Sequence, residues 1–452
     1  MNYQERLLKA IPGGAHTYSR GYDQFPTNAP AILNRGKGSY VFDSEGKRYL
    51  DYGMGIRSVN IGYAEKEIND AVVNEINKGN NLTRPSMIEL EAAELMIDLV
   101  DSVDMVKFTK NGSTAVSAAV KLSRAFTGKE IVARCAEQPF FSYDDWFISS
   151  TPIVRGIPVE TLKNTKTFQY NNINSLESLI QEFPDQIACV VLEPAYTECP
   201  SIGDFVSGCC SERNCSRSYK TGNDNYLKQV QKLCNKYGIV FILDETITGF
   251  RWDLKGAQHF YEVTPDLCTF GKAMANGFSV SCVAGKREIM ELGSIEFQAR
   301  ERVFLLSTTH GAEMGSLGAF IANVDFIKKN KVIEKQWKYG KSLIEMLKQK
   351  AKEHGIESNF VIGGPACLPY FVTMDVTGST SLELRTLFSQ EMIKNGVLMP
   401  WISIAYRHGE EEFSITEKAV DTSFKVYANA LKHGVSNYLV GPAIKPVFRK
   451  FN

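Results

Sequence analysis

Short apolar runs alternate with amphipathic stretches between about residues 85 and 290. The runs MVKFT, IACVVLEP and GIVFILDE, at 105–109, 187–194 and 238–245, are typical of buried strands. Apolar residues at helical spacing follow the first run and precede the third, and these predicted helices end at Gly128 and Gly238. Such alternation predicts an α/β fold, with a mainly parallel sheet that is covered by helices on both faces.

The two ends of the chain follow other patterns. GSYVFDSEGKRYLDY, at 38–52, alternates apolar and polar residues on either side of a turn, which predicts a hairpin. From about residue 325 the chain is charged and helical, with short strands and a last helix after it, which is typical of a smaller α+β unit. We therefore expect an N-terminal arm and hairpin at 1–60, a large α/β domain at 61–320 and a small C-terminal α+β domain at 321–452.

Charge and hydropathy limit the class of protein. Lys plus Arg number 51 and Asp plus Glu also number 51, which argues against nucleic acid or a membrane surface as the partner. The first residues form no apolar signal core, and no run of about 18 apolar residues is present. These features predict a soluble cytoplasmic protein.

The ten cysteines do not suggest a disulfide scaffold in a chain of 452 residues. Six lie in or beside apolar segments and are expected in the core: Cys135, Cys189, Cys234, Cys268, Cys282 and Cys367. The other four share one polar stretch whose spacing fits no known zinc or iron–sulfur pattern: Cys199, Cys209, Cys210 and Cys215. We expect an inserted surface loop there and no metal site.

The segment TKNGSTA joins the first predicted strand to a helix. Gly112, Ser113 and Thr114 would place backbone N–H groups and two hydroxyls at the start of that helix. Such a position binds anions, because the first N–H groups of a helix have no partner inside it. An ordinary capped helix start is the alternative, since Ser and Thr are favoured caps.

Two charged features follow at the ends of later strands. Asp244 and Glu245 end the run GIVFILDE, and Lys272 lies among small and aromatic residues in FGKAMANGF. A carboxylate there could bind a metal, a ribose hydroxyl or a protonated ring nitrogen, or it could cap a turn. An amine in a pocket of low polarity has a lowered pKa and becomes a nucleophile, whereas a lysine at a strand end can also simply reach solvent.

The segment EQPFFSYDDWF carries four aromatic residues, Phe140, Phe141, Tyr143 and Trp146, which would cover a flat ring or form a core patch. Together the four features meet the needs of pyridoxal 5′-phosphate (PLP): a phosphate site, a partner for the ring nitrogen, a stacking surface and a Schiff-base lysine. Lys272 would then also be the general base.

The chain resembles class III, fold-type I PLP-dependent aminotransferases, and is most similar to the glutamate-1-semialdehyde 2,1-aminomutase branch. The resemblance rests on PDLCTFGKAMANGFSVSCVAGKREIM, LDETITGFR, KNGSTAVSAAVKLSRAFTGK, FFSYDDW and LSTTHGAEMGSLGA. It implies the PLP-dependent transferase fold of type I, with a seven-stranded sheet. It also implies that Lys272 and Asp244 are catalytic, with Asp244 on the ring nitrogen.

The resemblance further implies a homodimer whose active sites are shared across the interface. Arg20, with Thr17 beside it, would hold a substrate carboxylate, although Arg20 could equally be a solvated residue of the N-terminal arm. The implied cofactor-binding residues are Gly112, Ser113, Thr114, Phe140, Glu193, Asp244, Thr246, Lys272, Thr309 and Thr308; of the last two, Thr309 is the expected contact to the neighbouring subunit's phosphate and Thr308 the alternative.

These features predict an aminotransferase that moves an amino group from a donor such as glutamate to a carbonyl acceptor. Amino-substituted precursors of cell-surface polymers are the suggested product class. An aminomutase of tetrapyrrole synthesis is the alternative, and a non-catalytic PLP-fold binding protein is the alternative from another class. Arg407, His408 and Glu410 would belong to a different substrate pocket from that of the aminomutase.

Overall fold

The computed structural model describes residues 2–201, 224–296 and 301–452. The chain forms two compact units, one of Met1–Glu65 with Glu334–Asn452 and one of Lys66–Ile333. The larger unit is a single segment, and the smaller one joins both ends of the chain. The division at residues 60 and 320 that we expect from the sequence stays a prediction.

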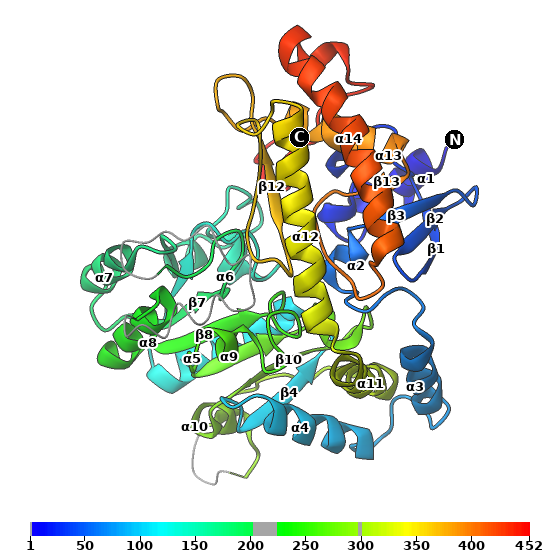
Figure 1. The fold of residues 1–452 in the computed structure, drawn as a ribbon. Helices are drawn as coiled ribbons and strands as arrows, with labels where there is room; N and C mark the ends of the chain where they lie inside the picture. Colours follow the sequence, from blue (N-terminus) through cyan, green and yellow to red (C-terminus); the bar gives the residue numbers. More distant parts are fainter. Residues whose placement is uncertain (1, 202–223, 297–300) are drawn as a thin grey trace. The chain divides into compact units, whose positions relative to one another are not determined.

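The larger unit is built on a seven-stranded sheet in the order β4-β10-β9-β8-β7-β5-β6 (Figure 1). β10 runs antiparallel to both of its neighbours, and the other adjacent strands are parallel to each other. The strands are β4 Met105–Thr109, β5 Ile131–Cys135, β6 Thr165–Phe168, β7 Ile187–Leu192, β8 Val240–Glu245, β9 Leu267–Phe270 and β10 Ser281–Gly285. The predicted fold class is confirmed.

Every residue of β7, β8, β9 and β10 is buried. Because successive side chains of a strand point to opposite faces, both faces of the central sheet are covered. α5 packs across five of the strands. The helices of this unit are α3 Lys66–Ile76, α4 Met87–Leu99, α5 Gly112–Thr127, α6 Asp145–Ile148, α7 Ile173–Glu182, α8 Tyr226–Tyr237, α9 Ala257–Phe260, α10 Arg287–Met290 and α11 Met314–Asn330, with the 3₁₀ turn η6 Lys272–Ala275.

Glycines end two of these helices, as the sequence predicts. Gly128 follows α5 with φ 70° and Gly238 follows α8 with φ 59°, so both adopt the left-handed conformation that glycine tolerates best. The helical stretch expected from about residue 325 begins earlier in the structure and is interrupted. α11 begins at Met314, and Lys331, at φ 51°, separates it from α12 Val332–Glu353. The charged stretch is therefore two helices and not one.

The smaller unit contains the predicted hairpin. β2 Tyr40–Asp43 and β3 Arg48–Asp51 pair antiparallel, with β1 Leu33–Lys37 beside β2 and β13 Val397–Leu398 parallel to β3. A second, two-stranded sheet joins β11 Phe360–Gly363 to β12 Tyr370–Thr373. The helices of this unit are α1 Tyr3–Ala10, α2 Met54–Arg57, α13 Leu382–Lys394 and α14 Glu410–His433, together with most of α12.

The six cysteines expected in the core are buried and free. The expectation of a surface position is wrong for Cys199, which is buried and is not among the free cysteines. Cys209, Cys210 and Cys215 lie outside the described residues.

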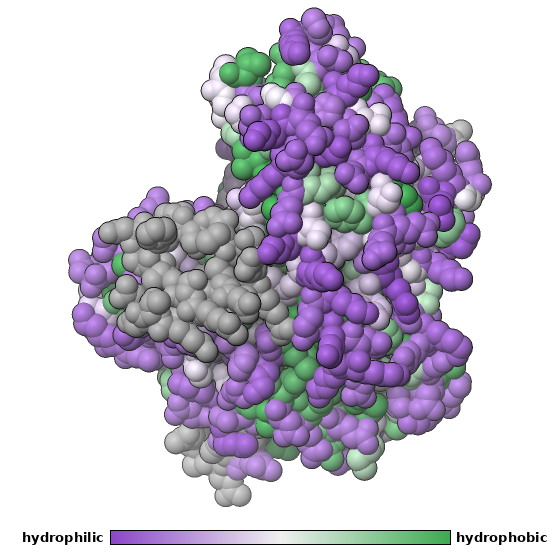
Figure 2. All heavy atoms as spheres, in the orientation of Figure 1, coloured by the Kyte–Doolittle hydropathy of each residue, from purple (hydrophilic) through white to green (hydrophobic). Residues whose placement is uncertain are grey.

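Within the described ranges, no helix has the length and apolar character that crossing a membrane requires. Polar side chains cover much of the described surface in Figure 2, with apolar patches between them.

Candidate active site

Asp244 lies near the carboxyl end of β8, directly beside β9. Its register partner on β9 is Thr269, whose hydroxyl donates a hydrogen bond to Asp244 Oδ1 at 2.8 Å. The backbone N–H of Thr246 donates to the same oxygen at 2.9 Å. Asp244 is buried. These two donors fix the orientation of its carboxyl group.

Burial raises the pKa of Asp244, and hydrogen bonds from Thr246 and the charge of Lys272 oppose that rise. A buried carboxyl group is costly to ionise unless a positive charge lies nearby. Because the charge of Lys272 acts on Asp244, the two predicted residues lie near each other in the folded chain. A protonated ring nitrogen against Asp244 would stabilise the carboxylate for the same reason.

Lys272 is the first residue of η6 and is half-buried, with φ 45°. It follows Gly271, where a Cβ atom would lie 2.5 Å from Ser281 Oγ and 3.3 Å from Thr246 Cγ2. A Cβ atom at Gly112 would lie 2.8 Å from that same methyl group. The side chain of Thr246 therefore lies between the turn of Lys272 and the start of α5. Glycine at positions 271 and 112 leaves room for it, because a Cβ atom at either position would crowd its methyl group.

The predicted phosphate cup is the first turn of α5. Asn111 is its N-cap, and its side chain accepts from Thr114 N at 2.9 Å and from Thr114 Oγ1 at 3.1 Å. The capping residue is thus Asn111, which precedes the Ser and Thr considered from the sequence. The N–H groups of Gly112 and Ser113 have no partner within the helix, because they belong to its first turn. The arrangement suits an anion at this end.

The aromatic segment is fastened to α5 beside that turn. Trp146 Nε1 donates to Ser117 Oγ at 2.8 Å, and the Tyr143 hydroxyl lies 3.4 Å from Thr114 Oγ1. Phe141 and Trp146 are buried as core residues, whereas Phe140 is 46% exposed. Of the four aromatic residues, two therefore belong to the core, and Phe140 and Tyr143 keep accessible surface for a ligand.

Glu193 follows β7 and is buried. Gln138 binds its backbone from both sides: Gln138 Nε2 donates to Glu193 O at 2.9 Å, and Glu193 N donates to Gln138 Oε1 at 2.7 Å. Because Gln138 is two residues before Phe140, these bonds join Glu193 to the aromatic segment. Gln138 carries no signal of this role in the sequence, because its partner Glu193 lies 55 residues further along the chain.

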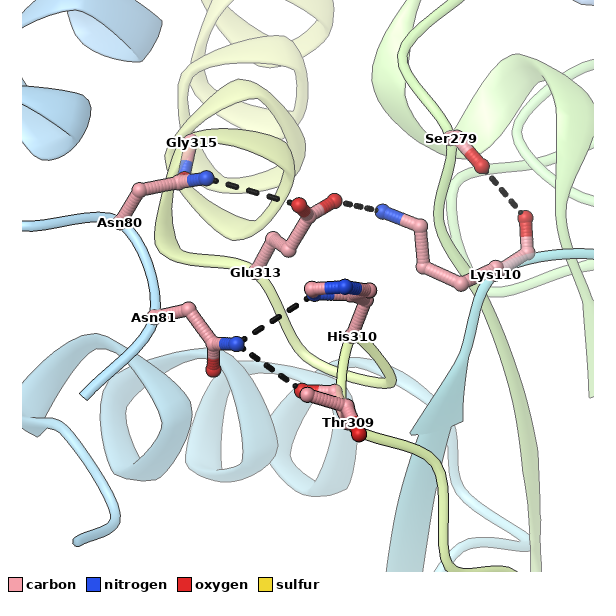
Figure 3. A network of polar contacts seen from close by, with 8 residues as sticks. All are labelled: Asn80, Asn81, Lys110, Ser279, Thr309, His310, Glu313 and Gly315. Atoms are coloured by element: carbon pink, nitrogen blue, oxygen red, sulfur yellow. Dashed lines mark hydrogen bonds and ion pairs between the residues drawn. The ribbon is translucent and has the colours of Figure 1, made fainter. Parts of the chain in front are cut away.

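Thr308 and Thr309 lie exposed in the loop before α11. Asn81 Nδ2 donates to Thr309 O at 3.1 Å, as Figure 3 shows. At the end of the loop, Glu313 forms an ion pair with Lys110, two residues before Gly112. Polar contacts thus tie this loop to the segment that leads into the cup. These partners could not be predicted from the sequence, since single polar side chains in loops carry no periodic signal.

Arg20 and Thr17 belong to the smaller unit. Arg20 is exposed and Thr17 half-buried, and the charge of Arg20 acts on Tyr63. The structure brings Asp244, Thr246, Lys272 and the start of α5 together in the larger unit. Arg20 and Thr17 lie in the smaller unit, so their predicted role at the substrate stays a prediction.

The assignment of Arg407, His408 and Glu410 to a substrate pocket stays a prediction. His408 is buried and stacks on Tyr52, with ring centroids 4.5 Å apart, and both ring nitrogens are engaged by backbone groups. Arg407 forms a two-pronged ion pair with Glu65, at 2.9 Å for each hydrogen bond. These are structural contacts of the smaller unit.

The residues of the larger unit fit the needs of PLP. They provide a buried carboxyl group, an amine in its electrostatic range, an accessible aromatic ring and an open helix start. The missing Cβ atom at Gly112 lets the side chain of Thr246 lie against that helix start. Among the described residues, no cluster of His, Cys, Asp and Glu is arranged to hold a metal ion.

The proteins to which this chain is similar are aminotransferases, in agreement with the fit of the site to PLP. The family model "Aminotransferase class-III" matches residues 18–204 and 218–363. The 3-aminobutyryl-CoA aminotransferase of Cloacimonas acidaminovorans (strain Evry) is 29% identical over 433 residues, which cover 94% of this chain and 96% of that protein.

Two solved structures show the same fold. The FumI protein of Sphingopyxis sp. MTA144, in its PLP internal aldimine form, has a TM-score of 0.82 at 22% identity and covers 95% of this chain and 97% of its own. An omega-transaminase from Sphaerobacter thermophilus has a TM-score of 0.80 at 22% identity, with coverage of 94% and 97%.

Proposed function

The chain belongs to the class III aminotransferase family, whose members use PLP to move amino groups between small molecules, and we propose that it transfers the amino group of glutamate to a carbonyl acceptor. One observation carries the assignment of the site. Lys272 and Asp244 stand at the ends of the adjacent strands β9 and β8, and the charge of Lys272 acts on the Asp244 carboxyl group. A nucleophilic amine and a buried carboxyl group in that relation suit amino-group chemistry.

Each residue then has a defined task. PLP, when bound, supplies an aldehyde that accepts the amino group and a ring that withdraws electrons from the substrate carbon. Asp244 would hold the proton on the ring nitrogen. The amine of Lys272 would bind the aldehyde before substrate arrives and would afterwards take up and return the substrate proton.

The remaining predicted residues would position the cofactor. Gly112, Ser113 and Thr114 would hold its phosphate at the start of α5. Phe140 would cover one face of the ring, and Thr246 would lie against the other. Glu193 would line the same site from the end of β7.

We further propose a homodimer with shared active sites. Thr309, or Thr308 in its place, would reach the phosphate bound by the neighbouring subunit. The exposure of both residues supports this proposal, because a side chain that reaches another subunit must lie on the surface of its own. Arg20, with Thr17, would hold a substrate carboxylate.

Two acceptor classes are supported by different observations. Similarity to the aminomutase branch suggests carbonyl precursors of amino-substituted cell-surface polymers. The name of the Cloacimonas relative suggests instead an acyl thioester with its carbonyl on carbon 3. The intramolecular aminomutase reaction on glutamate-1-semialdehyde is the alternative to both.

The deciding experiment follows conversion between the PLP and pyridoxamine phosphate forms by absorbance. Glutamate alone should convert the enzyme in one half-reaction, and the correct acceptor should restore the PLP form. Keto-sugar nucleotides, a 3-oxoacyl thioester and glutamate-1-semialdehyde are the acceptors to compare. Turnover of the semialdehyde without any added donor would replace the transaminase proposal by the aminomutase. A protein that takes up no PLP would overturn the assigned site.

A further inference from the structure

The backbone of Lys272 is held in an unfavourable conformation. Its φ of 45° lies in the left-handed region, where the Cβ atom of an L residue crowds the following carbonyl oxygen. Gly271 before it is extended, and Asn276 after η6 is again left-handed at φ 46°. Such a turn persists only where surrounding contacts determine it, and strained turns of this kind are frequent at functional sites.

One side chain of α11 holds this turn. Asn323 Nδ2 donates to Ala273 O and to Met274 O, each at 2.9 Å. These are the two carbonyl groups that follow Lys272 in the chain. The two N–H donors of one planar amide group therefore fix the orientation of two successive peptide groups beside the lysine.

The stability of α11 by itself does not account for an asparagine at this position. Asn323 is fully buried, and its neighbours on the helix include the buried residues Phe320, Val324 and Ile327. Its Oδ1 atom finds no hydrogen-bond partner among the described residues, which is unfavourable for a buried polar atom. An apolar residue would avoid that penalty, so the two donor bonds are the contribution specific to asparagine.

We propose that Asn323 is a positioning residue for Lys272: its amide fixes η6 so that the lysine amine points at the cofactor aldehyde and, later, at the substrate proton. This inference rests on the proposed role of Lys272. Asn323 itself contacts neither substrate nor cofactor. It acts through the peptide groups of Ala273 and Met274.

The smaller unit offers a matched control. Gln336 is also buried, and its Nε2 donates to two backbone carbonyl groups, Asn60 O at 2.8 Å and Ile404 O at 3.0 Å. Its Oε1 likewise has no partner among the described residues. Asn323→Leu and Gln336→Leu therefore remove the same kind and number of hydrogen bonds, but only the first removes them from the turn of Lys272.

Three measurements separate positioning from stability. The first is the melting temperature of the cofactor-free proteins. The second is the rate at which acetic anhydride acylates Lys272 in those proteins, followed by peptide mass spectrometry against other lysines of the same sample. The third is kcat and KM of the PLP-loaded enzyme, together with the fraction of PLP that borohydride fixes to Lys272.

We expect similar losses of melting temperature in both variants. In Asn323→Leu, kcat should fall on the order of 100-fold while KM stays within about threefold, because a misplaced reactive group affects the chemical step more than binding. The acylation rate of Lys272 and the borohydride-fixed fraction should also change in that variant. In Gln336→Leu, kcat, KM, the acylation rate of Lys272 and the borohydride-fixed fraction should match the wild type, although the melting temperature falls as in Asn323→Leu.

Equal effects of the two variants on Lys272, or no effect of Asn323→Leu, would overturn the proposal. If Asn323→Leu does not fold, Asn323→Ser decides the question, since its short hydroxyl cannot reach both carbonyl groups; unchanged acylation of Lys272 in that variant overturns the inference. Wild-type protein that is not fixed by borohydride at Lys272 would instead refute the proposed function, which keeps the two failures distinguishable.

Discussion

His408 makes the stability of the smaller unit depend on pH. Burial lowers its pKa from 6.5 to about 4. The geometry agrees with a neutral ring: Ala405 N donates to Nδ1 at 2.9 Å, so Nδ1 carries no proton, and Nε2 donates to Asp51 O at 3.1 Å. A proton added to Nδ1 would face the N–H of Ala405 and break that hydrogen bond.

The direction and size of the effect follow from proton linkage. Between pH 6.5 and 4 the unfolded chain binds a proton at His408 that the folded chain does not, so the free energy of unfolding falls as the pH falls. One unit of pKa difference corresponds to about 1.4 kcal/mol. The contribution of His408 is therefore fully present above pH 6.5, and about 3 kcal/mol of it is lost by pH 4.

The assay compares wild type with His408→Gln, and uses His433→Gln as the control because His433 is exposed at the end of α14. Native-state hydrogen exchange of peptides covering residues 400–412, between pH 7 and pH 4.5, gives the local free energy of opening. The difference between wild type and His408→Gln should shrink steadily with falling pH, and the control should follow the wild type. A constant difference, or an NMR titration of His408 near pH 6.5, would refute the reasoning.

Three further predictions concern single residues. Gly340→Ala should destabilise the smaller unit by about 3 kcal/mol or more in hydrogen exchange, because its Cβ would lie 1.6 Å from Ala366 O; an unchanged exchange rate would contradict the packing. Lys331→Gly should raise the free energy of unfolding by about 0.5–1 kcal/mol in urea titrations, since the exposed lysine ends α11 at φ 51°; a loss of stability would argue against that conformation. Thr269→Val removes a donor to Asp244, so kcat should fall about tenfold with the melting temperature nearly unchanged, and an unaltered kcat would remove Thr269 from the site.

Local patterns predicted three of the seven strands of the larger unit and two of its helices. The runs that became β4, β7 and β8 are apolar, and the helices beside them end at Gly128 and Gly238. These signals are contained in a few neighbouring residues, because burial on both faces and a left-handed helix end each restrict the residue types locally. The break between α11 and α12 at Lys331 could not be predicted in this way, because a lysine gives no local signal for the left-handed conformation.

Some residues of the candidate site could likewise be predicted from the sequence and others could not. Asp244 and Lys272 could be selected from the sequence, because charged residues are rarely buried and both lie in segments of apolar or small residues. The aromatic segment could also be selected, but the sequence does not show which of its rings are buried and which are accessible to a ligand. Only burial in the folded chain separates Phe141, in the core, from Phe140, which stays accessible.

The sequence by itself therefore determined the α/β alternation of the larger unit and the candidates for its reactive groups. The tertiary structure decided how those groups are held. Asn323 meets the turn of Lys272 from 50 residues away, and His408 lies against a residue 357 positions earlier. Contacts over such separations leave no periodic trace in the chain, because they depend on which surfaces pack together and not on neighbouring residues.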